Sequence, residues 1–290
     1  MNNLKGVGVA LVTPFNEDLS VDFDSLTRLI EYNIENGTNY LVVLGTTAEA
    51  ATLSKEEKKE VIKHVIKINS KRLPLVLGIG GNNTLEVKKQ IEETDLSDFD
   101  AVLSVSPYYN KPNQEGLYQH YKALAETGKQ IIIYNVPGRT GQNIEAATTV
   151  RLANDFPNLF MIKEACPNIN QYFDILRTKP DGFSLVSGDD EYTLPGTLAG
   201  GDGVISVIGQ AYPKEFSTMV ELAFERKVDE AYKIHNKLVE ITRLIFAEGN
   251  PVGIKTVLAE KGIIKNFLRL PLVKASKKIK KRIQDEMKNI

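Results

Sequence analysis

The chain has little of several residue types that would point to particular functions. It contains one cysteine, Cys166, so it cannot form an internal disulfide, which fits a reducing compartment. Its three histidines, His64, His120 and His235, are scattered and lack the spacing of zinc ligands or a basis for a Ser-His-Asp triad. The formal net charge is -1, so nothing favours a general affinity for nucleic acid or for anionic membranes.

Long apolar runs are also missing. No stretch approaches the length needed to span a bilayer, and residues 1–6 lack the charged and then apolar profile of a signal peptide. Hydrophobic residues make up 42% and charged residues 25% of the 290 residues, as in globular proteins with a substantial core. These features predict a soluble, cytoplasmic protein without nucleic-acid or membrane partners.

Short apolar segments alternate with longer amphipathic ones. The short segments are rich in Val, Ile and Leu without intervening polar residues, as expected for strands covered on both faces. We predict eight strands, at residues 7–12, 40–44, 75–79, 101–105, 131–134, 160–163, 183–187 and 203–207. Helices are expected between them, for example at residues 22–36, 55–69, 114–126 and 146–154. Ser54 and Glu57 form a capping-box sequence, and Gly37 is a candidate C-terminal cap.

The number of these units indicates the architecture. Eight strand–helix units in about 210 residues are more typical of a closed parallel barrel than of an open doubly wound sheet, which is the alternative. After the eighth strand, helical patterns follow without another strand, at residues 213–226, 228–247, 251–260 and 271–287. We therefore predict an α/β chain: a (β/α)8 TIM barrel at residues 1–224 and a C-terminal helical appendage at residues 225–290.

Two strand ends carry residues suited to carbonyl chemistry. Lys163 ends the sixth apolar segment, where an apolar setting would favour the uncharged, nucleophilic amine needed for a Schiff base. A lysine at a strand end can also simply extend to water. Tyr134 ends the fifth strand and offers a phenol for proton transfer. Because barrel enzymes carry their sites at the C-terminal strand ends, we expect the two side chains to meet.

Other strand ends carry further polar groups. Thr46 and Thr47 follow the second strand and offer hydroxyls and backbone N–H groups for a small carboxylate, although an ordinary turn has the same composition. Arg139, after the fifth strand, can donate two hydrogen bonds to a carboxylate. Tyr108 and Tyr109 are expected to point in different directions, so that one lines the pocket while the other reaches a neighbouring subunit.

Two further features are explained by ordinary structural roles. Asp189 and Asp190 could bind a metal or act as acid and base, but we expect them to cap a helix that begins near Glu191. Cys166, three residues after Lys163 and without a paired histidine, is expected to be a buried thiol. No Gly-x-Gly-x-x-Gly sequence follows a strand, so dinucleotide binding is not expected.

Taken in order, these segments resemble the dihydrodipicolinate synthase family, which belongs to the N-acetylneuraminate lyase superfamily of class I, pyruvate-using aldolases. The matching segments are GTTAE (45–49), SPYYN (106–110), YNVPGRT (134–140), IKE (162–164), SGDD (187–190) and GVISV (203–207). The resemblance extends from residues 12–15 to residues 268–271. Several ordered motifs are specific together, although each alone is weak.

The resemblance implies a TIM barrel with a C-terminal helical domain, assembled as a homotetramer that is a dimer of dimers. It implies condensation of pyruvate with L-aspartate 4-semialdehyde to 4-hydroxy-tetrahydrodipicolinate, the first committed step towards diaminopimelate and lysine. The imine nitrogen would be the electron sink, so no metal or organic cofactor is expected. Two alternatives stay open: another pyruvate-dependent lyase, such as N-acetylneuraminate lyase or a 2-keto-3-deoxy sugar-acid aldolase, and a non-catalytic binding barrel.

The resemblance also implies roles for individual residues. Lys163 matches the Schiff-base lysine, and Tyr134 matches the proton donor and acceptor. Thr46 and Tyr109 match the other members of a proton relay, with Tyr109 expected from the neighbouring subunit. The matches to substrate contacts are Thr47 and Ile205 for pyruvate, Gly188 beside them, and Arg139 for the semialdehyde at the mouth of the site.

One departure concerns regulation. Asn82, Glu86 and Tyr108 match the allosteric contacts of lysine-inhibited members. Those members carry histidines at the start of the helix after the second strand, where this chain has Lys55 and Lys58. Two added cations should repel a cationic effector, so we predict weak feedback control by lysine.

Overall fold

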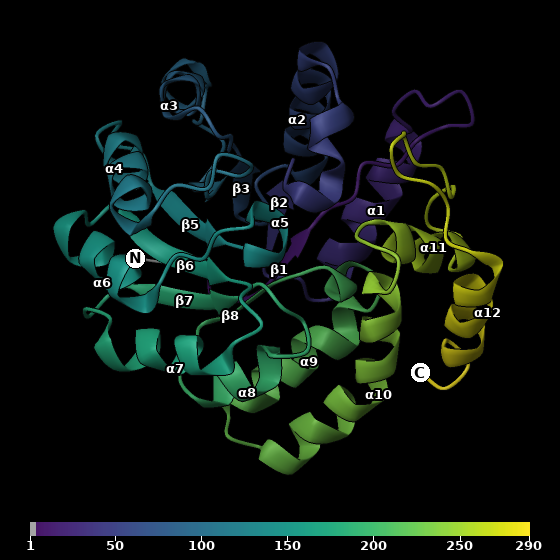
Figure 1. Cartoon of the computed structure of the whole chain (residues 1–290). Coiled ribbons are helices and arrows are strands. Elements are labelled where there is room, and N and C mark those ends of the chain that lie inside the picture. Colours follow the sequence, from purple (N-terminus) through teal and green to yellow (C-terminus); the bar gives the residue numbers. More distant parts are fainter. Residues whose placement is uncertain (1–3) are drawn as a thin grey trace.

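The structure, a computed structural model, describes residues 4–290 and contains a closed barrel of eight parallel strands (Figure 1). The strands are β1 (Gly6–Ala10), β2 (Tyr40–Val43), β3 (Leu75–Gly78), β4 (Ala101–Val105), β5 (Ile131–Asn135), β6 (Leu159–Glu164), β7 (Ser184–Ser187) and β8 (Gly203–Ser206). Each strand pairs with the next, and β8 closes the barrel against β1 with Ile205 opposite Gly8. The predicted TIM barrel is confirmed, and every predicted strand end lies within two residues of the observed one.

Apolar side chains fill two layers of the barrel. A smaller cluster occupies the interior and includes Val42, Leu103, Ile132, Tyr134 and Ile205. A larger cluster lies between the strands and the surrounding helices and continues into the C-terminal helices. The strands are therefore buried on both faces, which explains why their sequences are almost continuously apolar.

Helices follow the strands around the barrel. They are α1 (Phe23–Glu35), α2 (Lys55–Asn69), α3 (Thr84–Glu93), α4 (Gln114–Ala125), α6 (Ala146–Asp155), α7 (Ile169–Thr178), α8 (Thr193–Leu198) and α9 (Pro213–Phe224), with a short α5 (Pro137–Thr140) after β5. The predicted capping box is confirmed: Ser54 Oγ accepts from Glu57 N, and Ser54 N donates to the Glu57 carboxylate. Gly37 follows α1 with a φ of 89°, as a C-terminal glycine should.

Three more helices extend beyond α9 and lie together beside the barrel (Figure 1): α10 (Val228–Phe246), α11 (Val252–Glu260) and α12 (Lys277–Glu286). The predicted start of the last helix at residue 271 is wrong, because the hydroxyl of Ser276 caps the helix by accepting from Ile279 N. The division at residues 224 and 225 falls between α9 and α10 and stays a prediction.

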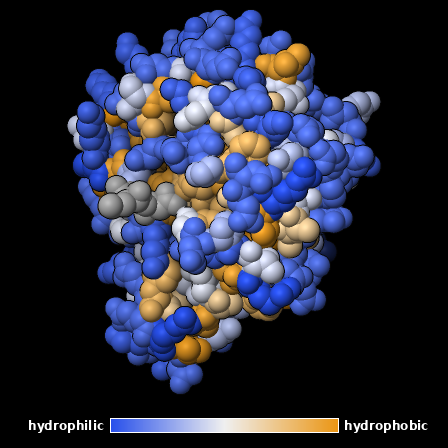
Figure 2. Space-filling view, turned by 90° about the vertical axis from the view of Figure 1, so that its left-hand side faces the viewer, coloured by the Kyte–Doolittle hydropathy of each residue, from blue (hydrophilic) through white to orange (hydrophobic). Residues whose placement is uncertain are grey.

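In the part of the chain from residue 4 onwards, no helix is long and apolar enough to cross a bilayer. Hydrophilic residues cover most of the face shown in Figure 2, with hydrophobic residues visible between them.

Candidate active site

Strands β5 and β6 bring Tyr134 and Lys163 side by side. The two residues are register partners, and Lys163 Nζ lies 4.3 Å from the centroid of the Tyr134 ring. Their exposed fractions are 6% for Tyr134 and 4% for Lys163. Within residues 4–290 no acidic side chain forms an ion pair with Lys163. A buried amine without a carboxylate partner beside a phenol suits carbonyl chemistry.

Gly188 leaves room for the lysine side chain. It follows β7, and its N–H donates to Glu164 O at 2.7 Å. A Cβ at this position would lie 3.0 Å from Lys163 Cε and 2.7 Å from the Cβ of Ala165. Any larger residue at position 188 would therefore displace the Lys163 side chain. Tyr134, Lys163 and Gly188 thus lie together at this end of the barrel, and Ile205 belongs to the same interior cluster as Tyr134.

The two threonines lie in a short 3-10 turn, η1 (Thr46–Ala48), directly after β2. Thr47 is buried, and its Oγ1 accepts a hydrogen bond from Asn250 Nδ2 at 2.9 Å. Because Thr47 accepts this bond, its own hydroxyl proton remains free to be donated to an anion. The Thr46 hydroxyl has no hydrogen bond to any other described residue. Sequence reasoning missed Asn250, whose role depends on a contact distant in sequence.

Arg139 and Asn250 connect the mouth of the site to the C-terminal segment. Arg139 lies on α5, is exposed, and its NH2 group donates to Asn250 O at 3.1 Å. Asn250 therefore contacts both Arg139 and Thr47, the residues matched to the semialdehyde and to pyruvate.

The two adjacent tyrosines, Tyr108 and Tyr109, are both exposed. Tyr109 has a φ of 73° and an exposed fraction of 89%, while Tyr108 is 44% exposed. Asn82 Nδ2 donates to Tyr108 O at 3.1 Å, which joins two of the positions matched to the effector site. In the described part of the chain Tyr109 has no hydrogen bond to Thr46 or Tyr134. A single chain thus leaves this tyrosine facing outward.

Behind the two strand ends lies a buried polar network that sequence reasoning missed. Glu164, 2% exposed, accepts from Asn135 Nδ2 at 2.9 and 3.1 Å, from Gln171 Nε2 at 2.8 Å and from Cys166 N at 2.7 Å. Burial raises the pKa of Glu164 to about 7, although these hydrogen bonds act in the opposite direction. The available signal was that Asn135 and Glu164 directly follow Tyr134 and Lys163 in strands whose successive side chains alternate between faces.

We predict that Glu164 makes stability depend on pH. Its pKa in the folded chain lies above the unfolded value, so its stabilising contribution is complete below about pH 4.5 and is lost as the pH rises through about 7. The loss amounts to about 3 kcal/mol of the free energy of unfolding. Urea denaturation at pH 5 and pH 8 should show a smaller decline in Glu164→Gln, which cannot ionise. Equal declines in both proteins would contradict the prediction.

Two expectations about the nearby acidic and thiol groups need correction. Helix α8 begins at Thr193 without a side-chain cap, so the predicted capping of this helix by Asp189 and Asp190 is wrong. Asp189 accepts from Glu191 N at 2.9 Å, in the turn before the helix. Asp190 is buried and instead accepts from Val207 N and Ile208 N, at 3.1 and 3.0 Å, where it fixes the chain after β8. Burial raises its pKa to about 6. Cys166 is half-buried rather than buried, because it lies in the loop after β6.

The histidines take no part in the site. His64 lies on α2 and His120 on α4, as expected, and His235 lies on α10. Among the described residues no group of three or more His, Cys, Asp or Glu side chains is placed to hold a metal ion.

A closed barrel with polar groups gathered at its carboxyl edge is the architecture of the (β/α)8-barrel enzymes. The sequence profile of the dihydrodipicolinate synthetase family matches residues 3–290. The 4-hydroxy-tetrahydrodipicolinate synthase of Flavobacterium psychrophilum is 55% identical over 279 residues, which cover 96% of this chain and 95% of that protein. The chain therefore belongs to the dihydrodipicolinate synthetase family.

Solved structures agree with this assignment. A monomeric variant of dihydrodipicolinate synthase superposes with a TM-score of 0.96 at 39% identity, covering 99% of this chain and 97% of that one. The chloride-inhibited dihydrodipicolinate synthase of Acinetobacter baumannii, complexed with pyruvate, has a TM-score of 0.95 at 40% identity and covers 99% of this chain and 98% of that one.

Proposed function

We propose that this chain condenses pyruvate with L-aspartate 4-semialdehyde to 4-hydroxy-tetrahydrodipicolinate, as a cytoplasmic lyase of lysine and diaminopimelate biosynthesis. The observation that carries the proposal is the buried Lys163 amine beside Tyr134 at the carboxyl edge of the barrel. Relatives that are 43–55% identical over nearly the whole chain support the choice of this reaction within the superfamily.

The proposed reaction begins at Lys163. Its amine attacks the keto carbon of pyruvate, and loss of water leaves an imine. Loss of a methyl proton then gives an enamine, with Tyr134 and Thr46 passing the protons. The enamine carbon attacks the aldehyde, and the amine of the semialdehyde closes the ring and releases Lys163. In this proposal Thr47, Ile205 and Gly188 hold pyruvate, and Arg139 meets the semialdehyde carboxylate. The imine nitrogen serves as the electron sink, so the reaction needs no organic cofactor.

An aldehyde panel tests this function. Purified protein is incubated with pyruvate and, separately, L-aspartate 4-semialdehyde, N-acetylmannosamine or glyceraldehyde, and the products are identified by mass spectrometry. We expect product only with the semialdehyde. Faster turnover with either sugar would replace the proposal with that of a sugar-acid lyase, and a pyruvate adduct without turnover of any aldehyde would support a binding barrel.

We further propose that Tyr109 completes the site of a neighbouring subunit in a dimer of dimers. The support is its exposed fraction of 89% on a single chain and its position in the SPYYN segment. Tyr109→Phe alone should lower kcat by about 10²-fold, because a relay member is lost. Mixed dimers of Tyr109→Phe and Lys163→Ala subunits should regain activity, since one of their two sites has every group intact.

The control is a mixture of Lys163→Ala subunits with Lys163→Ala, Tyr109→Phe subunits, in which no intact site can form. Mixed dimers are verified by differential tagging. Mixed dimers that form and are no more active per intact Lys163 than Tyr109→Phe dimers would show that Tyr109 acts within its own chain.

We predict weak inhibition by L-lysine. Lys55 and Lys58 lie in the first turn of α2, where the helix dipole already disfavours positive charge. A bound lysine adds another ammonium, at a cost of about 1 kcal/mol for each close pair in a solvated site. Calorimetric titration of lysine into the pyruvate-bound protein should show weak binding. Lys55→His, Lys58→His should bind more tightly, and tight binding by the wild type would contradict the prediction.

A further inference from the structure

A buried ion pair joins the C-terminal helices to the loop that carries the two threonines. Lys255, on α11, is fully buried, and its Nζ lies 2.5 Å from Glu49 Oε1. Glu49 directly follows the turn η1 and precedes a second turn, η2 (Ala50–Thr52). Its φ of 53° lies in the left-handed region, which a residue with a side chain rarely adopts without support.

The groups around the ion pair come from two separate parts of the chain, the β1–α1 loop and the segment after α11. Lys255 Nζ also donates to Phe267 O at 3.0 Å and lies 4.1 Å from the centroid of the Phe15 ring in the β1–α1 loop. Glu49 Oε2 accepts from Arg269 N at 3.1 Å. Burial lowers the pKa of Lys255 to about 8, and the Glu49 carboxylate opposes this shift.

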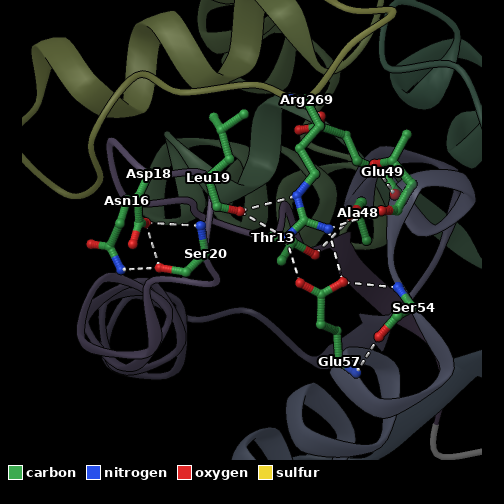
Figure 3. A network of polar contacts seen from close by, with 11 residues as sticks. Thr13, Asn16, Asp18, Leu19, Ser20, Ala48, Glu49, Ser54, Glu57 and Arg269 are labelled. Atoms are coloured by element: carbon green, nitrogen blue, oxygen red, sulfur yellow. Dashed lines mark hydrogen bonds and ion pairs between the residues drawn. The ribbon is translucent and has the colours of Figure 1, made fainter.

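Arg269 binds the C-terminal end of the same loop, where the loop leads into α2 (Figure 3). Its guanidinium donates to Thr52 O at 2.8 Å, to Leu19 O at 2.7 Å and to both carboxylate oxygens of Glu57 at the start of α2. The N-terminal end is held by Thr13 Oγ1, which donates to Ala48 O at 2.7 Å. Within residues 4–290, the contact between this loop and a residue inside the C-terminal helices is the one at Glu49, in the middle of the loop.

A second contact runs from the same segment to a site residue. Asn250 lies just before α11, and its side chain donates to Thr47 Oγ1, as described above. A displacement of α11 would therefore disturb both the backbone at Glu49 and the hydroxyl of Thr47.

Stability alone does not explain an ion pair at this place. Both charges lose their hydration on burial, and well-packed apolar side chains of similar volume often stabilise a fold as well as a buried ion pair does. What the pair adds is a defined geometry, because the carboxylate must meet one ammonium and one backbone N–H at fixed distances.

We propose that Glu49 and Lys255 are positioning residues, whose ion pair lets the C-terminal helices set the orientation of Thr46 and Thr47 towards pyruvate. This inference rests on the proposed function, in which Thr47 contacts pyruvate and Thr46 belongs to the proton relay. Neither Glu49 nor Lys255 touches the substrate.

The test compares Lys255→Met and the double variant Glu49→Gln, Lys255→Met with a matched control. The control is Lys280→Met, which removes the partly exposed Lys280–Glu260 pair between α12 and α11. For each protein, kcat is expressed per site that borohydride traps with pyruvate, so that unfolded protein is not counted. Pyruvate KM and the melting temperature are measured in parallel.

Lys255→Met should raise the pyruvate KM about tenfold and lower kcat per trapped site about tenfold, because a misplaced contact costs rate without loss of fold. The double variant removes both charges, so it should melt above Lys255→Met while its pyruvate KM remains raised. Lys280→Met should behave as the wild type.

Normal kinetics in the double variant would overturn the inference, since the ion pair would then serve the fold alone. This outcome remains decisive if Lys255→Met does not fold. A wild type that forms no pyruvate adduct would contradict the proposed function itself. A wild-type adduct with unchanged kinetics in the variants would contradict only the positioning role.

Discussion

Lys163→Ala should lose the borohydride-trapped pyruvate adduct entirely and keep its fold. The amine at the end of β6 supplies the covalent bond to the keto carbon, and no other group in the proposed reaction can replace it. Turnover should fall by roughly 10⁴-fold or more, as when the nucleophile of a covalent catalyst is removed. The fold should persist, because Lys163 takes part in no ion pair within the described residues.

Lys255 provides an internal check on this result. Lys163 and Lys255 are the two lysines that are buried among residues 4–290. The Lys255 amine is already bound by the Glu49 carboxylate and by Phe267 O. Mass mapping of the trapped wild type should therefore find the adduct on Lys163 and not on Lys255. A normal adduct in Lys163→Ala, or an adduct mapped to any other lysine, would refute the Schiff-base assignment.

The barrel was predictable because each strand is buried on both faces, so that segments such as Ile131–Asn135 carry few polar residues. Counting eight such segments was enough to favour a closed barrel. The proximity of Tyr134 and Lys163 was also predictable. Each residue lies near the C-terminal end of its strand, and the C-terminal ends of parallel strands lie at the same edge of the barrel.

The contacts missed from the sequence all depend on partners that are distant along the chain. Asp190 has the local sequence pattern of a helix cap, but its carboxylate accepts hydrogen bonds from the backbone N–H groups of Val207 and Ile208 instead. The Glu49–Lys255 pair joins the β2–α2 loop to α11, and neither residue has a local signature. Pattern reasoning detects local geometry and strand periodicity, whereas such long-range polar pairs require the packed fold.

Tyr134→Phe should lower kcat by on the order of 10²–10⁴-fold while changing the pyruvate KM little. The substitution keeps the ring that lies 4.3 Å from Lys163 Nζ and removes only the hydroxyl, so the packing around the lysine is preserved. A proton relay acts on the transfer steps and not on ground-state binding, which is why the two kinetic constants should separate. Thr46→Val should show the same separation.

Exchange of the pyruvate methyl protons with deuterated water, followed by NMR, reports the imine-to-enamine step directly. This exchange should slow in Tyr134→Phe along with kcat. Tyr118→Phe is the matched control: it loses a hydrogen bond to Asp155 on the helical shell, at α4 and α6, and should keep normal exchange. If Tyr134→Phe kept nearly normal kcat and exchange, another group would have to carry the protons. That result would refute the role of Tyr134 in proton transfer and leave the assignment of Lys163 as the Schiff-base residue unchanged.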